Sequence, residues 1–117
     1  MIEGAAMSDP RLKSRLVVQA LIRRAEVAGL VAMVMRSGDA DAGAIALVLD
    51  RFGAGSRLFA QARDGDGRLV WAPADGGKPL DAPDLADRLE RSTRRDPDLW
   101  ILSIEDPKAL FDPNGQG

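Results

Sequence analysis

The chain has 117 residues, of which 45% are hydrophobic, and its 16 Lys and Arg nearly balance its 18 Asp and Glu, giving a net charge of −2. This length and composition are typical of one globular domain, and the charge provides no overall basic field for nucleic acid. Histidine, cysteine and tyrosine do not occur, which excludes Ser-His and Cys-His catalytic pairs, the usual zinc ligands and disulfide bonds.

Residues 1–9 are expected to form a flexible leader before a single domain at 10–106, and Met7 is an alternative initiator. The leader lacks the basic and apolar regions of a signal peptide, and no apolar run is long enough to span a bilayer. Because the sequence also holds no cysteine, it favours a cytoplasmic protein that does not enter a membrane.

A helix is predicted at 14–28, where the apolar residues form one broad face. Ser14 is expected to cap its start, and Gly29 is expected to end it because glycine readily adopts the left-handed conformation beyond a helix. A short strand at 16–19 with a shorter helix behind it is the alternative, since that apolar run is short enough for either structure.

Four strands are predicted in the middle of the chain, at 30–36, 44–50, 57–63 and 68–72. The third alternates between apolar and polar residues, which is the period of a half-buried strand. The sequence DGDG at 64–67 favours a tight hairpin between the third and fourth strands. The segment SGDADAG at 37–43 is expected to turn the chain in the same way, so neighbouring strands should be antiparallel.

A second helix is predicted at 83–95, with Pro83 near its start, an acidic residue in its first turn and two arginines in its last turn. A final strand at 99–104 and a flexible tail at 107–117 follow. The elements predict an α+β fold in the order α-β-β-β-β-α-β. We expect a mainly antiparallel sheet of four to five strands with both helices packed on one face.

Three stretches of the sequence together resemble a small proteobacterial family, the domain of unknown function 1491 (DUF1491). They are ALIRRAE at 20–26, RSGDADAG at 36–43 and RRDPDLWI at 94–101. The likeness spans roughly residues 10–106. The resemblance implies a compact bacterial protein of the cytoplasm, and it implies no activity, cofactor or site residue because the family has none assigned.

Arg24 projects from the apolar face of the first predicted helix. A guanidinium keeps its charge, so it should meet a carboxylate, a bound anion or water. One interpretation is an Arg–Asp pair that joins helix and sheet. The other is a weak anion site, in which Arg23 and Arg24 act with Arg11 and Arg15 on phosphate-bearing ligands or nucleic acid.

Asp39 and Asp41 resemble part of a calcium-binding loop, but the remaining oxygen ligands and the final Glu of such a loop are missing. Asp64 and Asp66 fail in the same way. Aspartates of this kind commonly accept hydrogen bonds from their own backbone in turns. We therefore predict turns at both places and no metal site.

Arg88, Arg91 and Arg95 share one stripe of the second predicted helix. Such a stripe could follow the phosphates of a ligand. Nearby acids such as Asp84 and Asp87 favour instead a solvated face with pairs three or four residues apart.

A degenerate metal-dependent nuclease is the enzymatic alternative. Nucleases of this type place carboxylates and a lysine on adjacent strands around a metal ion. The candidates here are Glu26, Asp41 and Asp50, with Gln61 and Arg63 standing where an acid and the lysine are needed. Arginine does not give up its proton, so Arg63 is a poor substitute. The sequence therefore favours a protein with no catalytic residues and no cofactor.

Trp71 and Trp100 are the largest side chains of the predicted strands, and they serve either as core residues or as anchors for a partner protein. The first functional hypothesis is a small non-enzymatic accessory module that binds another protein. The second is a weak binder of nucleic acid or phosphate ligands. Its candidate ligand-binding residues are Arg23, Arg24, Asp39, Asp41, Gln61 and Arg63. The oligomeric state stays open.

Overall fold

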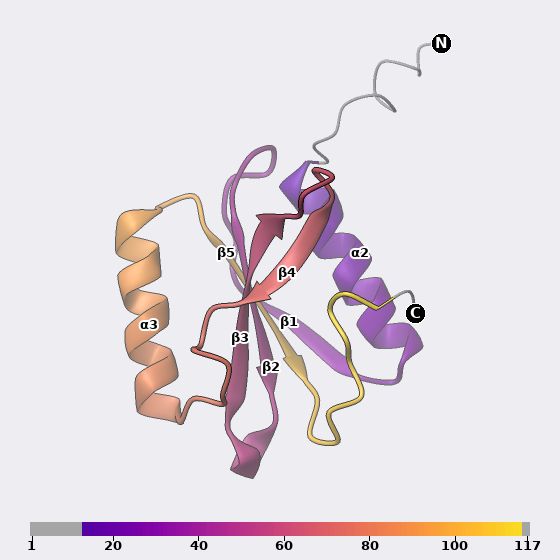
Figure 1. Ribbon diagram of the computed structural model, residues 1–117, viewed down its shortest axis with the longest axis vertical. Coiled ribbons are helices and arrows are strands. Elements are labelled where there is room, and N and C mark those ends of the chain that lie inside the picture. Colours follow the sequence, from indigo (N-terminus) through magenta and orange to yellow (C-terminus); the bar gives the residue numbers. More distant parts are fainter. Residues whose placement is uncertain (1–12, 116–117) are drawn as a thin grey trace.

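The computed structural model describes residues 13–115, and the leader predicted at 1–9 lies outside them. Figure 1 shows a single sheet between two helices. The elements are α2 (Ser14–Val27), β1 (Val31–Arg36), β2 (Ile45–Asp50), the 3₁₀ turn η1 (Phe52–Ala54), β3 (Ser56–Arg63), β4 (Leu69–Pro73), α3 (Ala82–Arg95) and β5 (Trp100–Glu105). The predicted order of elements is confirmed, and the alternative strand at 16–19 is wrong. No helix within the described residues is long and apolar enough to cross a membrane.

The five strands form one mixed sheet in the order β1-β5-β2-β3-β4. The last strand of the chain, β5, lies between β1 and β2, antiparallel to β1 and parallel to β2. The two remaining pairs are antiparallel. Leu102 and Ile104 of β5 are fully buried, as a central strand requires. The mainly antiparallel α+β fold predicted from the sequence is therefore confirmed.

The segment at 37–43 does not form a hairpin between neighbouring strands, because β5 separates β1 from β2. The segment instead crosses the chain just before β5, where the Asp39 amide donates to the Asp98 carbonyl oxygen at 3.0 Å. A Cβ atom on Gly38 or Gly43 would lie 2.0 or 2.2 Å from that same oxygen. Only glycine allows the backbones to approach so closely.

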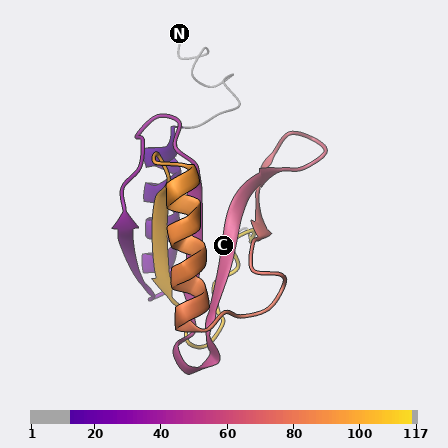
Figure 2. The ribbon, with the colours of Figure 1, turned by 90° about the vertical axis from the view of Figure 1, so that its left-hand side faces the viewer.

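The helices cover opposite faces of the sheet, and the expectation of one shared face is wrong. Leu47 and Leu49 of β2 pack with Leu21 of α2, whereas Ala46 and Val48 point the other way and pack beneath α3. Figure 2 shows α3 in front of the sheet and α2 behind it. The reason lies in β2, whose sequence IALVL is apolar on both faces. A strand that is buried on both faces needs cover on both.

Helix α3 rests on the sheet through a small part of its surface. Asp81 caps its start by accepting a hydrogen bond from the Asp84 amide at 2.9 Å. Leu85 and Leu89 pack against the core. The structure describes every residue of the helix, and none of them is fully buried. Space therefore remains between α3 and the outer strands.

The C-terminal segment packs on the domain as far as residue 114, although a flexible tail was predicted from residue 107. Phe111 is 6% exposed and belongs to the core on the α2 side. Asp106 is fully buried and accepts hydrogen bonds from the Leu110 and Phe111 amides at 2.8 and 2.9 Å. The buried ring and this buried carboxylate anchor the stretch for which a flexible tail was predicted.

Candidate functional site

A groove of about 580 Å³ runs between α3 and the outer part of the sheet. Its floor is apolar and its wall is basic. The floor residues are Leu58, Ala60 and Ala74, and the wall residues are Arg88, Arg91, Ser92, Arg94 and Arg95. A concave surface with an apolar body and a few convergent polar groups is the usual form of a small-molecule site.

The groove exists because small side chains face α3 at this place. Ala60 of β3 pairs with Ala72 of β4. Next to them, the Ala74 amide donates to the Leu58 carbonyl oxygen at 2.8 Å. Alanine adds little bulk above a sheet, and α3 packs on the core through Leu85 and Leu89, in its first turn and its middle. The groove therefore opens between these small residues and the part of α3 from Arg88 to Arg95.

Three arginines of α3 follow the groove. Arg88 donates from Nη1 to the Ala74 carbonyl oxygen at 2.9 Å, which ties the wall to the floor. Arg91 pairs with Asp87 at 3.0 Å, and both side chains are about 60% exposed. Arg95 has no ion pair or hydrogen bond within residues 13–115. Exposed ion pairs contribute little free energy, so Arg91 and Arg95 are available to an anion.

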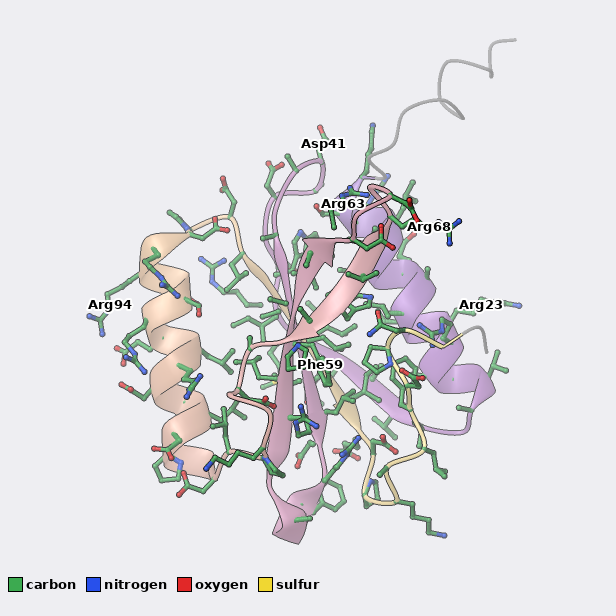
Figure 3. The ribbon with its side chains drawn as sticks, in the orientation of Figure 1. Arg23, Asp41, Phe59, Arg63, Arg68 and Arg94 are labelled. Atoms are coloured by element: carbon green, nitrogen blue, oxygen red, sulfur yellow. The ribbon has the colours of Figure 1, made fainter. Side chains whose placement is uncertain are left out.

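Arg94 differs from these three, because its guanidinium pairs with Glu90 at 3.2 Å and extends away from the sheet (Figure 3). No acidic residue is among the groove's lining residues in the described part of the chain. Guanidinium groups bind phosphate and carboxylate oxygens through paired hydrogen bonds, and they stay protonated. The Ser92 hydroxyl adds a further donor. This set of groups is suited to holding an anion.

A buried ion pair supports the floor of the groove. Asp75 is 2% exposed and accepts hydrogen bonds from Arg57 Nε at 2.6 Å and from the amides of Leu58 and Gly77 at 2.9 Å each. Burial alone would raise the pKa of Asp75, but the hydrogen bonds from Arg57 and the two amides, with the Arg57 charge, hold it below its ordinary value. The carboxylate thus stays ionised and fixes the chain directly after Ala74.

Three of the predicted ligand-binding residues, Asp41, Gln61 and Arg63, line a second hollow of about 570 Å³ beside the start of α2. Each already has a partner within the chain. Asp41 lies 3.8 Å from the Lys13 ammonium, the Gln61 side-chain oxygen accepts from the Ile45 amide at 3.0 Å, and Arg63 donates to the Gly67 carbonyl oxygen at 3.2 Å. This hollow combines both signs of charge and offers no unpaired cation.

The aspartate clusters are turns, as predicted. Asp39 accepts hydrogen bonds from the amides of Asp41 and Ala42 at 3.1 and 2.8 Å. Ser14 does not cap α2 with its hydroxyl. It donates instead to the Gly43 carbonyl oxygen, and the Ser14 amide donates to the Asp41 carbonyl oxygen at 3.3 Å. The loop at 37–43 therefore provides the hydrogen-bond acceptors for the first residues of the helix.

Arg23 and Arg24 do not share a site. Arg23 points into solvent from α2 (Figure 3). Arg24 donates to the carbonyl oxygens of Pro113 and Asp112 at 3.1 and 2.7 Å, and its guanidinium carbon lies 4.7 Å from the centroid of the Phe111 ring. The predicted Arg–Asp pair is not formed, because backbone carbonyls of the C-terminal segment accept the hydrogen bonds of the Arg24 guanidinium.

Trp71 and Trp100 are core residues, with exposed fractions of 6% and 8%. The Trp100 indole nitrogen donates to the Asp39 carbonyl oxygen at 2.7 Å. In this structure neither ring presents a surface to a partner protein.

The acids nominated for a nuclease do not converge. Asp41 lies in the loop before β2, and Asp50 is the last residue of that strand. The strand between them separates the two carboxylates by roughly 20 Å at about 3.3 Å per residue. Within residues 13–115 no three acidic side chains are grouped so as to hold a metal ion.

Comparisons with known proteins support the family resemblance found in the sequence. A family model described as "Protein of unknown function (DUF1491)" matches residues 12–111. No curated protein matches the chain significantly.

Among solved structures, the crystal structure of a DUF1491 family protein from Caulobacter crescentus is 43% identical, covers 83% of this chain and 90% of its own, and superposes with a TM-score of 0.72. An NMR structure of a DUF1491 family protein from Caulobacter crescentus is also 43% identical, with 83% and 87% covered and a TM-score of 0.69. A solution structure of an A. tumefaciens protein is 29% identical, with 90% and 99% covered and a TM-score of 0.70.

The arginine stripe was visible in the sequence, but it was interpreted as a solvated face. The signal that could have identified the groove is the run of small residues facing α3, of which Ala60, Ala72 and Ala74 are the clearest. These residues line a groove only because α3 covers the face of the sheet opposite to α2. The sequence analysis had predicted both helices on the same face.

Proposed function

The chain belongs to the DUF1491 family of proteins of unknown function, and we propose that it is a non-enzymatic binding protein whose α3 groove holds a small phosphate-bearing ligand. The observation that carries the proposal is an apolar floor beside a wall of arginines, with no lining carboxylate in the described part of the chain. The phosphate-ligand hypothesis thereby moves from the Arg23 and Arg24 region to α3.

The dimensions of the groove favour a small ligand. Its volume of about 580 Å³ lies within the range of small-molecule sites. Arg88 and Arg95 are seven residues apart, or about 10 Å along a helix. That span fits a molecule with one or two phosphate groups and a flat apolar part, which the alanines of the floor would receive.

A long nucleic acid fits the same surface less well. Asp87 and Glu90 lie on α3 beside the arginines and pair with two of them, so the helix carries no continuous positive stripe. The net charge of −2 adds no long-range attraction. Contact with a small anion needs only the few arginines that line the groove.

The proposal is tested by titrating the ¹⁵N-labelled protein with ADP, a nucleoside diphosphate that carries both features, and with pyrophosphate and adenosine separately. We expect the amides of Ala60, Ala74 and Arg95 to shift with ADP and less with pyrophosphate, at millimolar concentrations or below. Affinity should fall as salt rises, because guanidinium–phosphate contacts are screened. Shifts outside the groove, or none with any probe, would refute the proposal.

The matched variants are Arg91→Gln with Arg95→Gln, and Arg23→Gln as the control. Each charge-assisted contact contributes about 1.5–3 kcal/mol, so the double variant should bind ADP at least about tenfold more weakly. Arg23 is exposed on the far side of the sheet, and its replacement should leave binding unchanged. Equal losses of binding free energy per charge removed would show that the binding depends only on net charge.

The other expectations stay predictions. A cytoplasmic location can be tested by fractionating cells that carry a tagged chain. Binding to a different protein would need another surface than the two tryptophans, since both are buried.

A further inference from the structure

The outer strand β1 exposes apolar side chains that no other described element covers. Val31, Met33 and Met35 are 56%, 54% and 61% exposed. Val31 and Met33 pair with Glu105 and Ser103 of β5 and therefore share the α3 face of the sheet. Figure 2 shows β1 at one margin of the sheet, beside α3 and not beneath it. Adjacent exposed apolar side chains of this kind commonly mark an interaction site.

The two edges of the sheet are treated differently. At the β4 edge, the Asn114 side chain pairs with both backbone groups of Trp71, at 2.8 and 2.9 Å. At the β1 edge, none of residues 13–115 pairs with the outer side of the strand. β1 lacks the proline and lysine residues that commonly protect an edge, and its register shift against β5 and its one charged residue, Arg36, are confined to its end. One edge is closed by the chain itself, and the other is open.

We propose that the open edge binds the β1 strand of a second copy of this chain, so that two sheets join into one across a two-fold axis at Met33. The antiparallel arrangement places Met33 opposite its own copy and Val31 opposite Met35. On the α2 face, Ala32 meets Val34. The facing pairs from Val31 to Met35 are then all apolar, which suits the isologous contact of a two-fold dimer, and Met35 lies at the register shift of β1 against β5.

The charges at the two ends of β1 fit the same arrangement. Glu105 lies next to Val31 on the α3 face, and its carboxylate has no hydrogen bond or ion pair among residues 13–115. Arg36 ends the strand on the same face and donates from Nη1 to the Leu99 carbonyl oxygen at 2.6 Å. Two-fold symmetry brings the Arg36 end of one copy to the Glu105 end of the other, twice. At about 4.8 Å between strands, an arginine can reach across one strand to the carboxylate.

The first test is the mass of the native protein by light scattering during size-exclusion chromatography, at tens of micromolar chain. We expect twice the 12.5 kDa of the single chain. Met33→Lys should halve that mass, because it places two ammonium groups opposite each other. Gly65→Lys adds the same charge in the hairpin between β3 and β4, where nothing lies within 4 Å of an added Cβ, and it should leave the dimer intact. A monomeric native protein, or a dimer that survives Met33→Lys, would overturn the proposal.

The absence of cysteine allows a second test of the register. Facing residues of antiparallel strands have Cα atoms about 4.5–5.5 Å apart, which a disulfide can bridge. Met33→Cys should therefore form a covalent dimer under mild oxidation, and Asp66→Cys, in the exposed turn between β3 and β4 at the other edge of the sheet, should not. Equal crosslinking of both variants would indicate random collision and contradict the two-fold at Met33.

Discussion

The Asn114 side chain forms hydrogen bonds with both backbone groups of Trp71, as a neighbouring strand would. Its side-chain oxygen accepts from the Trp71 amide at 2.8 Å, and its side-chain nitrogen donates to the Trp71 carbonyl oxygen at 2.9 Å. One residue from the C-terminal segment thus satisfies both edge groups of β4 at its middle. Because unpaired edges invite pairing with other chains, this contact also protects the β4 edge.

Asn114→Ala should destabilise the protein by about 1–3 kcal/mol, since it leaves two backbone groups of Trp71 without partners. Urea unfolding followed by tryptophan fluorescence measures the loss. Asn114→Asp is the informative companion, because a carboxylate can still accept from the amide but cannot donate to the carbonyl. It should recover only part of the stability, and full recovery would show that the second hydrogen bond contributes nothing.

A separate prediction concerns the contacts of Arg24 with the C-terminal segment. Arg24→Ala removes two hydrogen bonds to the carbonyls of Asp112 and Pro113 and the contact with the Phe111 ring. We expect a loss of about 1–3 kcal/mol and faster hydrogen exchange at the Phe111 amide. Arg23→Ala, one residue away and exposed, should change neither quantity. Unchanged exchange in Arg24→Ala would mean that Phe111 alone holds the segment.

Replacing the Asp75 carboxylate should lower the stability of the protein more than replacing the exposed carboxylate of Asp41. Asp75→Asn leaves the Arg57 guanidinium, which is 19% exposed, without its ion pair. Removing one partner of a largely buried pair costs about 3 kcal/mol or more. The control Asp41→Asn breaks only the exposed contact with Lys13 and should cost less than about 1 kcal/mol. Thermal unfolding at pH 7 compares the two.

The same carboxylate gives a pH dependence with a defined sign. The pKa of Asp75 is lower in the folded protein than its ordinary value of 3.8. The unfolded chain therefore takes up a proton first as the pH falls, and the contribution of Asp75 to stability declines below about pH 4 until the folded pKa is passed. Above pH 5 this contribution is fully present. Urea titrations at pH 3 and 6 should show a larger loss for the native protein than for Asp75→Asn.

The sequence pattern predicted the number, type and order of the elements because the relevant signals are local. Alternation of residues marked β3, and the Asp-Gly turn marked its hairpin with β4. The pairing of strands was harder to predict from the sequence, because the insertion of β5 between β1 and β2 depends on contacts between distant segments. The buried role of Phe111 was hidden for the same reason: its partners Arg24 and Trp71 come from elsewhere in the chain.

The candidate site could be predicted from the sequence only in part, because it too depends on contacts between distant segments. The spacing of Arg88, Arg91 and Arg95 places them on one helix face whatever that face meets. Whether they bound a groove depends on the side chains opposite, and those belong to β3 and to the residues after β4. Asp41, Gln61 and Arg63 do meet, but internal partners already occupy their polar atoms.

Filling the groove distinguishes its shape from its charge. Ala60→Leu adds three carbons to the floor beneath the arginines and leaves every charge in place. We expect ADP to bind at least about tenfold more weakly, because the added volume displaces the apolar part of the ligand, while the unfolding free energy changes by less than about 1 kcal/mol. Ala62→Leu is the matched control, since residue 62 lies on the same strand and the same face but outside the groove lining. If Ala60→Leu binds like the native protein, the alanine floor takes no part in recognition, and the arginines alone would have to account for any binding observed.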